Sequence, residues 1–222
     1  LAILSVAMLG ALLAPLFATH DPNAIDMAAR LQAPSIAHWA GTDEVGRDIF
    51  SRILWGARAS LGIGLGVVAI GAILGSIIGG FSGLMGGWID SVIMRVMDLI
   101  MALPGLVLAL ALAAALGPSL INAMIAMGFL GVPGYCRVAR GQALTIRHQN
   151  FVLAARTFGA GHSYVLKRHI LPNLLAPMLV LATLDVGNAM IGVATLSFIG
   201  LGAQPPLAEW GAMVNSGQAY IL

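Results

Sequence analysis

The sequence predicts an all-α integral membrane protein, and three observations support that prediction. Hydrophobic residues make up 59% of the 222 positions and charged residues only 9%, whereas about a quarter of an ordinary soluble domain is charged. Several apolar runs approach or exceed the ~20 residues that a helix needs to cross a bilayer, so they are too long for signal peptides. The basic residues gather in one stretch between two of these runs.

Five membrane spans are expected, in a single domain that covers residues 1–222. Glycine and proline divide the apolar runs, as at 85–88 and 117–118. The third span continues a more polar helix that begins near Ile89. The chain opens inside an apolar run without a methionine, so we expect a truncated N-terminus. Five spans would leave the C-terminus outside, so we expect a sixth span beyond Leu222. The five expected spans are 1–19, 61–81, 103–116, 120–135 and 174–199.

The distribution of charge predicts the orientation. Six of the eleven basic residues lie between the fourth and fifth spans, with no acid among them. The positive-inside rule places this loop, residues 137–173, in the cytoplasm. Counting back, the N-terminus is cytoplasmic, whereas 20–58 and 200–222 are outside; five of the nine acids lie in 20–58. The six basic residues are Arg137, Arg140, Arg147, Arg156, Lys167 and Arg168.

Residues 151–173 are the candidate functional surface. Arg156, Lys167 and Arg168 would each be costly in hydrocarbon, so this segment lies at the membrane face. Gly159 and Gly161 permit sharp changes of direction, which predicts two short helices with a hinge between them. A hinged protrusion with an apolar face is suited to being held by another protein.

Within this segment, Leu153-Ala154-Ala155 is followed after three residues by Gly159 and, after nine more residues, by His169-Ile170-Leu171-Pro172. This spacing resembles the EAA loop of ABC importer permeases. In that family the loop forms an L-shaped coupling helix seated in a groove of the ATP-hydrolysing subunit. Leu153 stands in place of the motif's glutamate and His169 in place of its isoleucine, so docking should depend on apolar packing. The alternative is a generic basic loop with an interfacial helix. The resemblance assigns coupling to Leu153, Ala154, Ala155, Arg156, Gly159, Ala160, His162, His169, Leu171 and Pro172.

Residues 38–52 form a second signature within the outer segment 20–58. Thr42 is a candidate N-cap, with Asp43 and Glu44 in the first turn, and the apolar residues from Val45 to Leu54 share one face. This pattern predicts a helix lying on the outer membrane surface or against neighbouring spans. The segment is similar to the extracytoplasmic signature of dipeptide, oligopeptide and nickel permeases. Together with 114–120 and 198–203, it extends the resemblance over nearly the whole chain.

Gly71, Gly75 and Gly79 repeat every four residues and line one helix face. Such a row of small residues lets another helix approach closely. The partner helix lies either within this chain, which we favour, or in a second permease subunit.

Asp185 lies inside the fifth expected span, close to Asn188. A carboxylate within a membrane is a functional candidate by default, and a peptide amino group or a metal cation would suit it. The alternative is a structural role, with Asp185 bonded to Asn188, Thr183 or a neighbouring helix.

Other polar residues favour simpler interpretations. Asp98 is expected to pair with Arg95 on one helix, and Met94, Met97 and Met101 to pack in the core. The five histidines show no ligand spacing, so no metal site is predicted. His162 and His169 are better assigned to contact with an ATPase. The single cysteine, Cys136, excludes an internal disulfide.

The predicted function is transport, not catalysis. The chain has no GxxxxGK[ST] phosphate loop, so it should not bind ATP by the usual phosphate cradle, and no cofactor of its own is expected. The resemblance implies a type I importer in a bacterial or archaeal cytoplasmic membrane, with a second homologous permease, two ATPase subunits that bind ATP and Mg²⁺, and an external solute-binding protein. No nucleic-acid partner is expected.

The substrate is expected to be a short peptide, of which D-alanyl-D-alanine is one candidate. A nickel or other small-solute permease of the same family is the first alternative. An ion-coupled secondary transporter that uses Asp185 and a scaffold subunit of a membrane complex are the others.

Overall fold

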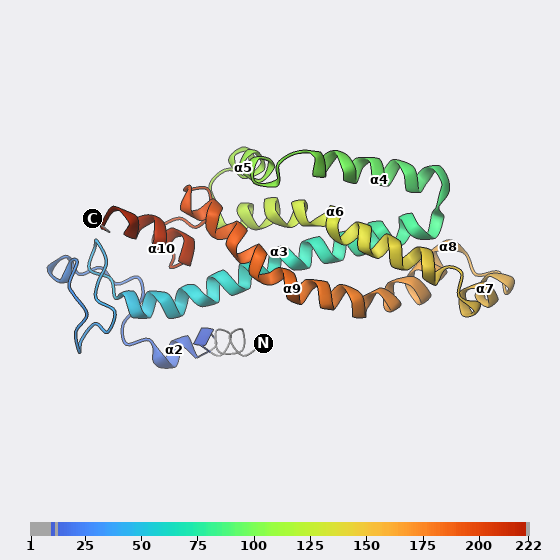
Figure 1. Ribbon diagram of the computed structural model, residues 1–222. Helices are drawn as coiled ribbons and strands as arrows, with labels where there is room; N and C mark the ends of the chain where they lie inside the picture. The colour runs from blue at the N-terminus through green and yellow to red at the C-terminus, as the bar shows by residue number, and fades with distance from the viewer. Residues whose placement is uncertain (1–9, 12, 221–222) are drawn as a thin grey trace. The chain divides into compact units, whose positions relative to one another are not determined.

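The computed structural model describes residues 10, 11 and 13–220. The secondary-structure elements assigned among these residues are all helical. Within these described residues, three helices are long and apolar enough to cross a membrane. They are α3 (Ile49–Met85), α6 (Leu120–Ile146) and the continuous helix His162–Phe198, which ends as α9 (Leu171–Phe198). A bent pair, α4 (Gly87–Ala102) and α5 (Gly105–Leu116), brings the count to four if the pair forms one span. Figure 1 shows these helices.

Two of the helices, α3 and α6, are longer than the sequence predicted. α3 begins at Ile49, and not near residue 61, while α6 continues to Ile146, past the expected end at Tyr135. Both extensions carry polar or charged side chains that find partners within the protein. The first expected span, 1–19, lies mostly outside the described residues; its described part includes the short helix α2 (Ala14–Phe17).

The expected continuous helix from near Ile89 to Leu116 is wrong. α4 and α5 meet at an angle of 91°. Pro104 follows the last turn of α4, and proline disfavours the helical conformation at the residue before it; Leu103 accordingly has extended backbone angles. The predicted breaks at 85–88 and at Gly117 are confirmed, because Gly86, Gly87 and Gly117 all have positive φ.

The chain divides into two compact units. Unit 2 comprises Gly66–Ala109 and Ile125–Asn188. Its core is the contact between the second half of α3 and α6, which run side by side (Figure 1). A Cβ added to Gly75 would lie 2.5 Å from Cβ of Tyr135, and one on Gly71 would lie 3.1 Å from the Tyr135 ring. Gly79 meets Cys136 and Ala139. The glycine row therefore packs within this chain.

Unit 1 comprises Leu1–Leu65, Leu110–Met124 and Ala189–Leu222. The expected surface helix over 42–54 is wrong, because its first part is a turn closed by a bridge between Thr42 and Asp48. Thr42 caps no helix: its hydroxyl donates to the Ala29 carbonyl and accepts from the Gln32 amide. The residues from Ile49 onward are instead the start of α3.

The C-terminal part of unit 1 is held on α3 by a buried carboxylate. Glu209, which is 2% exposed, caps α10 (Trp210–Gly217) by accepting from the amides of Gly211 and Ala212. The same carboxylate accepts a hydrogen bond from Ser60 of α3, and the Trp210 indole donates to the Ile53 carbonyl. Short helical turns at Met27–Ala29 and Gln218–Tyr220 complete the unit.

Candidate functional site

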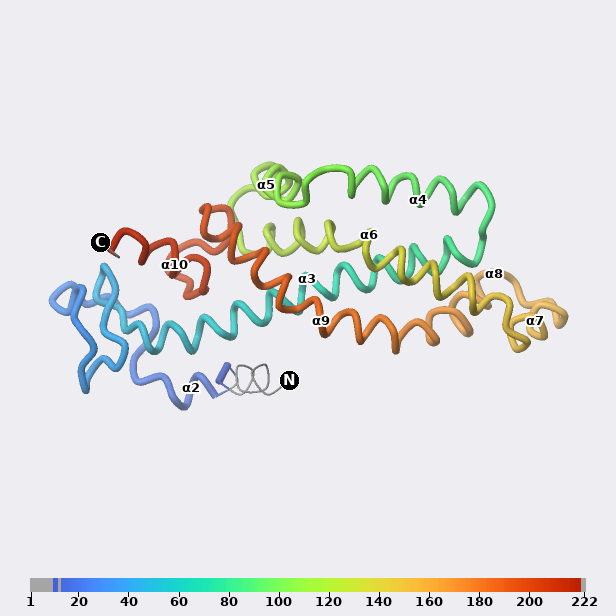
Figure 2. Tube along the Cα trace, viewed as in Figure 1, coloured from blue at the N-terminus to red at the C-terminus, as the bar shows by residue number. Residues whose placement is uncertain are grey.

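The segment predicted to couple is a helical hairpin in unit 2, as Figure 2 shows. It consists of α7 (Asn150–Thr157), a turn, α8 (His162–Val165) and a π-helical segment, Leu166–Ile170, that leads into α9. We call residues 150–170 the α7–α8 hairpin. The chain reverses at Gly159, whose φ of +86° suits glycine. The reversal at Gly159 is as the sequence predicted, but the expected second short helix is wrong, because α8 is the start of a helix that continues to Phe198, and Gly161 has an ordinary φ of −72°.

Four buried apolar side chains anchor the hairpin. Val152, Val165 and Ile170 are fully buried, and Leu174 in the next turn is nearly so. Gly80 of α3 receives this cluster, since a Cβ there would lie 3.3 Å from Leu174 and 3.5 Å from Ile170. The hairpin is therefore a packed part of unit 2.

The opposite side of the hairpin presents large apolar residues to solvent. Phe158, at the tip, is 92% exposed. A surface hollow of about 620 Å³ lies beside it, and Phe151, Ala155 and Tyr164 line this hollow. Exposed apolar groups gathered around a hollow make this side of the hairpin a candidate interaction surface.

His169 lies at the base of the same hollow. Its ring is 5.7 Å from that of Phe151 and 5.8 Å from that of Tyr164. The Nε2 atom is enclosed and has no hydrogen-bond partner among the described residues. The imidazole thus lies beside two aromatic rings, in a residue that is itself partly exposed.

The other assigned coupling residues divide between the hairpin and α9. Leu153, Ala154 and Arg156 lie exposed on α7, and His162 is exposed at the start of α8. Leu171 and Pro172 lie in the first turn of α9. Pro172 does not break the chain's helical path, because the helix is continuous from His162 to Phe198 and a wider π-helical turn, Leu166–Ile170, precedes the proline.

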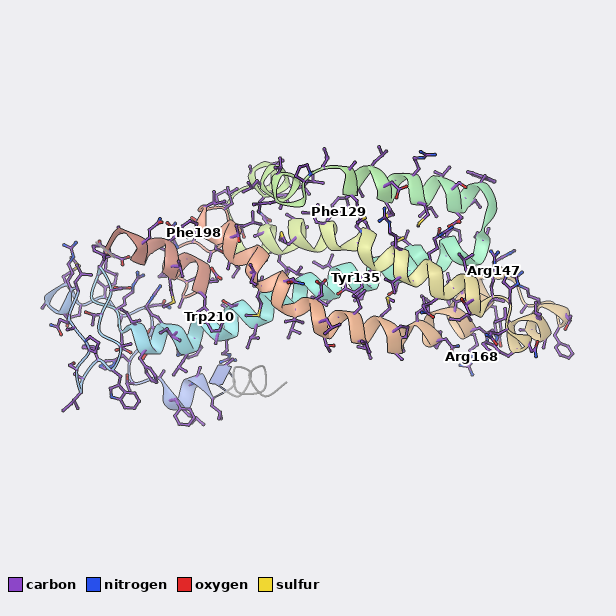
Figure 3. The ribbon with its side chains drawn as sticks, viewed as in Figure 1. Phe129, Tyr135, Arg147, Arg168, Phe198 and Trp210 are labelled. Atoms are coloured by element: carbon purple, nitrogen blue, oxygen red, sulfur yellow. The ribbon has the colours of Figure 1, made fainter. Side chains whose placement is uncertain are left out.

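Three arginines expected in a loop instead contact other helices: Arg137 and Arg140 lie in α6, and Arg147 directly follows its last residue. Arg140 donates to Asp90 of α4 through Nε and Nη2, each at 2.5 Å. Arg137 forms an ion pair with Asp98 at 2.6 Å. The expected pairing of Asp98 with Arg95 is therefore wrong. Arg147 donates to the Gly83 carbonyl at 3.0 Å. Figure 3 labels Arg147 and Arg168 near the hairpin. These contacts fix the end of α6 from which the hairpin starts.

Asp185 lies within α9 and bonds to α6. The hydroxyl of Tyr135 donates to its Oδ2 at 3.2 Å, and Asn188 lies 3.5 Å from its Oδ1. Tyr135 is buried, whereas Asp185 is partly accessible and Asn188 is exposed. The carboxylate thus has both a structural partner and an accessible side.

Sequence reasoning missed a cluster in unit 1. His20, His38 and Asp48 each offer a ligand atom within 4.8 Å of the others, although the histidines showed no ligand spacing in sequence. Burial raises the pKa of Asp48, but hydrogen bonds from Ser51 and His38 outweigh it, so this pKa lies below its usual value. Loop folding, which no local pattern signals, brings the three side chains together.

Comparison with known proteins decides the family. A family model described as the binding-protein-dependent transport system inner membrane component matches residues 71–222. The chain is 55% identical over 220 residues to the probable D,D-dipeptide transport system permease protein DdpC of Escherichia coli K12, covering 99% of this chain and 74% of that protein. The chain belongs to this family of transport components.

Two further relatives agree. The dipeptide transport system permease protein DppC of Alkalihalophilus pseudofirmus is 42% identical, over 100% of this chain and 73% of its own length. The glutathione transport system permease protein GsiD of Salmonella paratyphi A is 42% identical, over 99% and 71%. The chain is a multi-pass inner-membrane permease subunit of an ABC importer and not an enzyme, as the sequence predicted.

Proposed function

We propose that this permease forms half of the translocation pathway of an ATP-driven importer for short peptides, and that its α7–α8 hairpin docks on an ATP-hydrolysing subunit. The observation that supports docking is the division of the hairpin into a buried side and an apolar exposed side. Val152 and Val165 anchor it, while Phe158 and Tyr164 stand outside. Such exposed aromatic groups are typical anchors of protein interfaces.

The hairpin is built to transmit movement. α8, the π-helical segment and α9 form one helix of 37 residues, His162–Phe198. A displacement of the hairpin by a partner therefore acts on the same helix that carries Asp185. Alternating access follows if ATP binding closes two partner subunits, moves their docking grooves and tilts this helix.

The proposed assembly contains four other protein components. They are a second, homologous permease, two ATPase subunits that bind ATP and Mg²⁺, and an external binding protein that delivers solute. This chain would bind no cofactor itself and would otherwise contact membrane lipid. Its N-terminus and residues 137–173 face the cytoplasm in this arrangement, because basic residues favour that side.

The names of the relatives favour peptides over nickel. They specify D,D-dipeptides, dipeptides and glutathione, all of which carry an amino group and a carboxylate. Asp185 and Asn188 are proposed to line the pathway, where the accessible side of the carboxylate would attract a peptide amino group.

Uptake by the reconstituted importer, with its binding protein in the external medium, tests this function. Radiolabelled D-alanyl-D-alanine should enter vesicles only when ATP is enclosed with the ATPase subunits. An excess of unlabelled L-alanyl-L-alanine or Ni²⁺ as competitor then defines the substrate class. Uptake driven by an ion gradient without ATP would contradict the proposal, as would competition by Ni²⁺ alone.

A further inference from the structure

We propose that His20, His38 and Asp48 bind one divalent first-row transition-metal ion, of which Zn²⁺ is the representative. Two imidazole nitrogens and one carboxylate oxygen form a donor set typical of zinc sites, and imidazole suits Zn²⁺, Ni²⁺ and Cu²⁺ alike. Mg²⁺ and Ca²⁺ prefer sites made of oxygen atoms. This inference does not depend on the proposed transport substrate.

The three donor atoms are already close to the spacing that a metal requires. Nδ1 of His38 lies 2.9 Å from Oδ1 of Asp48, and Nδ1 of His20 lies 3.9 Å from the same oxygen. In a tetrahedral zinc site with bonds of about 2.0 Å, neighbouring donor atoms are roughly 3.3 Å apart. The two measured distances lie on either side of this value, so small side-chain movements would complete the site.

The carboxylate is held in place through one oxygen, while the other oxygen contacts the two imidazoles that would share the metal. Asp48 is 1% exposed, and its Oδ2 accepts from the Ser51 amide at 2.8 Å in the first turn of α3. Its Oδ1 is turned toward the two imidazole rings, whose centroids are 4.6 Å apart. Such support of a ligand from neighbouring groups is typical of metal sites.

The histidine backbones are also fixed. The amide of His20 donates to Ser51 Oγ at 3.1 Å, and that of His38 donates to Ser35 Oγ at 3.1 Å. The three ligands come from the segment after α2, from the 38–48 loop and from the residue that precedes α3. A bound ion would therefore join two loop segments to the beginning of a long helix.

The site is open on one side. The His20 side chain is 42% exposed and that of His38 is 16% exposed, so an ion can enter past His20. Three protein ligands leave a fourth position for water or another ligand. The simpler account of the cluster is a His38–Asp48 hydrogen bond to which His20 contributes nothing, and the two accounts differ in what His20 does.

Titration of the purified full chain in detergent, prepared with an affinity tag that contains no histidine, tests the proposal. Zn²⁺ competed against a chromophoric chelator should bind at one ion per chain. His20→Gln and His38→Gln should each weaken binding by roughly 10–100-fold. His148→Gln, which alters an exposed histidine in the other unit, should leave the affinity unchanged. Equal affinity in the His20→Gln chain and the unaltered chain would overturn the proposal.

A second measurement needs no variant and remains informative if a variant misfolds. Cu²⁺ bound to the unaltered chain at one equivalent should show pulsed EPR modulation from two imidazole nitrogens. Modulation from one imidazole or from water alone would contradict the site.

Discussion

Arg140 on α6 and Asp90 on α4 form a two-bond ion pair, with Nε to Oδ1 and Nη2 to Oδ2 both at 2.5 Å. Ser82 near the end of α3 donates to the same carboxylate at 2.6 Å. One carboxylate thus joins three helices of unit 2. The pair also neutralises a charge within a helix bundle, where an unpaired carboxylate would be costly.

Replacing Arg140 with glutamine should destabilise the protein. Asp90, whose side chain is 12% exposed, would lose two charge-assisted hydrogen bonds, which corresponds to about 2 kcal/mol. Unfolding of the purified permease by SDS in mixed micelles measures this loss. Arg137→Gln is the control, because that pair is half exposed at both ends and should contribute less than about 1 kcal/mol. If both variants lost the same free energy of unfolding, the Arg140–Asp90 pair would stabilise the protein no more than the exposed pair does.

Gly75→Ala should disturb the contact between α3 and α6. The new Cβ would lie 2.5 Å from Cβ of Tyr135 and 2.8 Å from the Val132 carbonyl oxygen, so the helices must separate at a cost of about 1–3 kcal/mol. Gly62→Ala on the same helix has open space around its Cβ and should be neutral or slightly stabilising. The same unfolding assay measures both variants. An unchanged free energy of unfolding in the Gly75→Ala chain would argue against close packing of α3 and α6 at Gly75.

Gly159→Ala should impair coupling without changing any contact. A Cβ there meets open space, but the φ of +86° disfavours an alanine by about 1–2 kcal/mol. Gly161 is two residues away, has equally open surroundings and a φ of −72°, so Gly161→Ala should be tolerated. We expect substrate-stimulated ATP hydrolysis by the reconstituted importer to fall only in the Gly159 variant. Equal ATP hydrolysis in the two variants would show that coupling does not depend on the backbone conformation at Gly159.

Asp185→Asn should lower peptide uptake several-fold while the complex still assembles. The amide keeps the hydrogen bond from Tyr135 but removes the negative charge. Tyr135→Phe is the matched control, because it removes the 3.2 Å hydrogen bond and keeps the charge. Uptake and assembly are measured on the same preparations. If the tyrosine variant loses uptake and the aspartate variant does not, Asp185 has a structural role only.

Local signals predicted the fold well where glycine or proline determines the backbone. The chain has positive φ at the breaks at Gly86 and Gly117 and at the reversal at Gly159. A glycine in the sequence is a direct signal for this backbone conformation. The close packing of Gly75 likewise follows from a four-residue repeat. Pro104 is an equally local signal, and it indicates the bend between α4 and α5.

Contacts between distant residues could not be predicted. Thr42 looks like a helix cap, but its hydroxyl bonds to Ala29 and Gln32, which no local pattern reveals. Arg140 finds its partner 50 residues away, so its charge was assigned to a solvated loop. The meeting of His20 with Asp48 depends in the same way on how the loop folds.

The most direct test of the central claim is co-purification of the permease with its ATPase subunits after Phe158→Asp. Phe158 is 92% exposed on the hairpin, and Ile36, at 96% exposed in unit 1, provides the control Ile36→Asp. Neither change disturbs a buried side chain, so both variants should fold. We predict that Phe158→Asp reduces recovery of the ATPase subunits at least tenfold, whereas Ile36→Asp leaves it unchanged. Full recovery with Phe158→Asp would contradict docking through this hairpin.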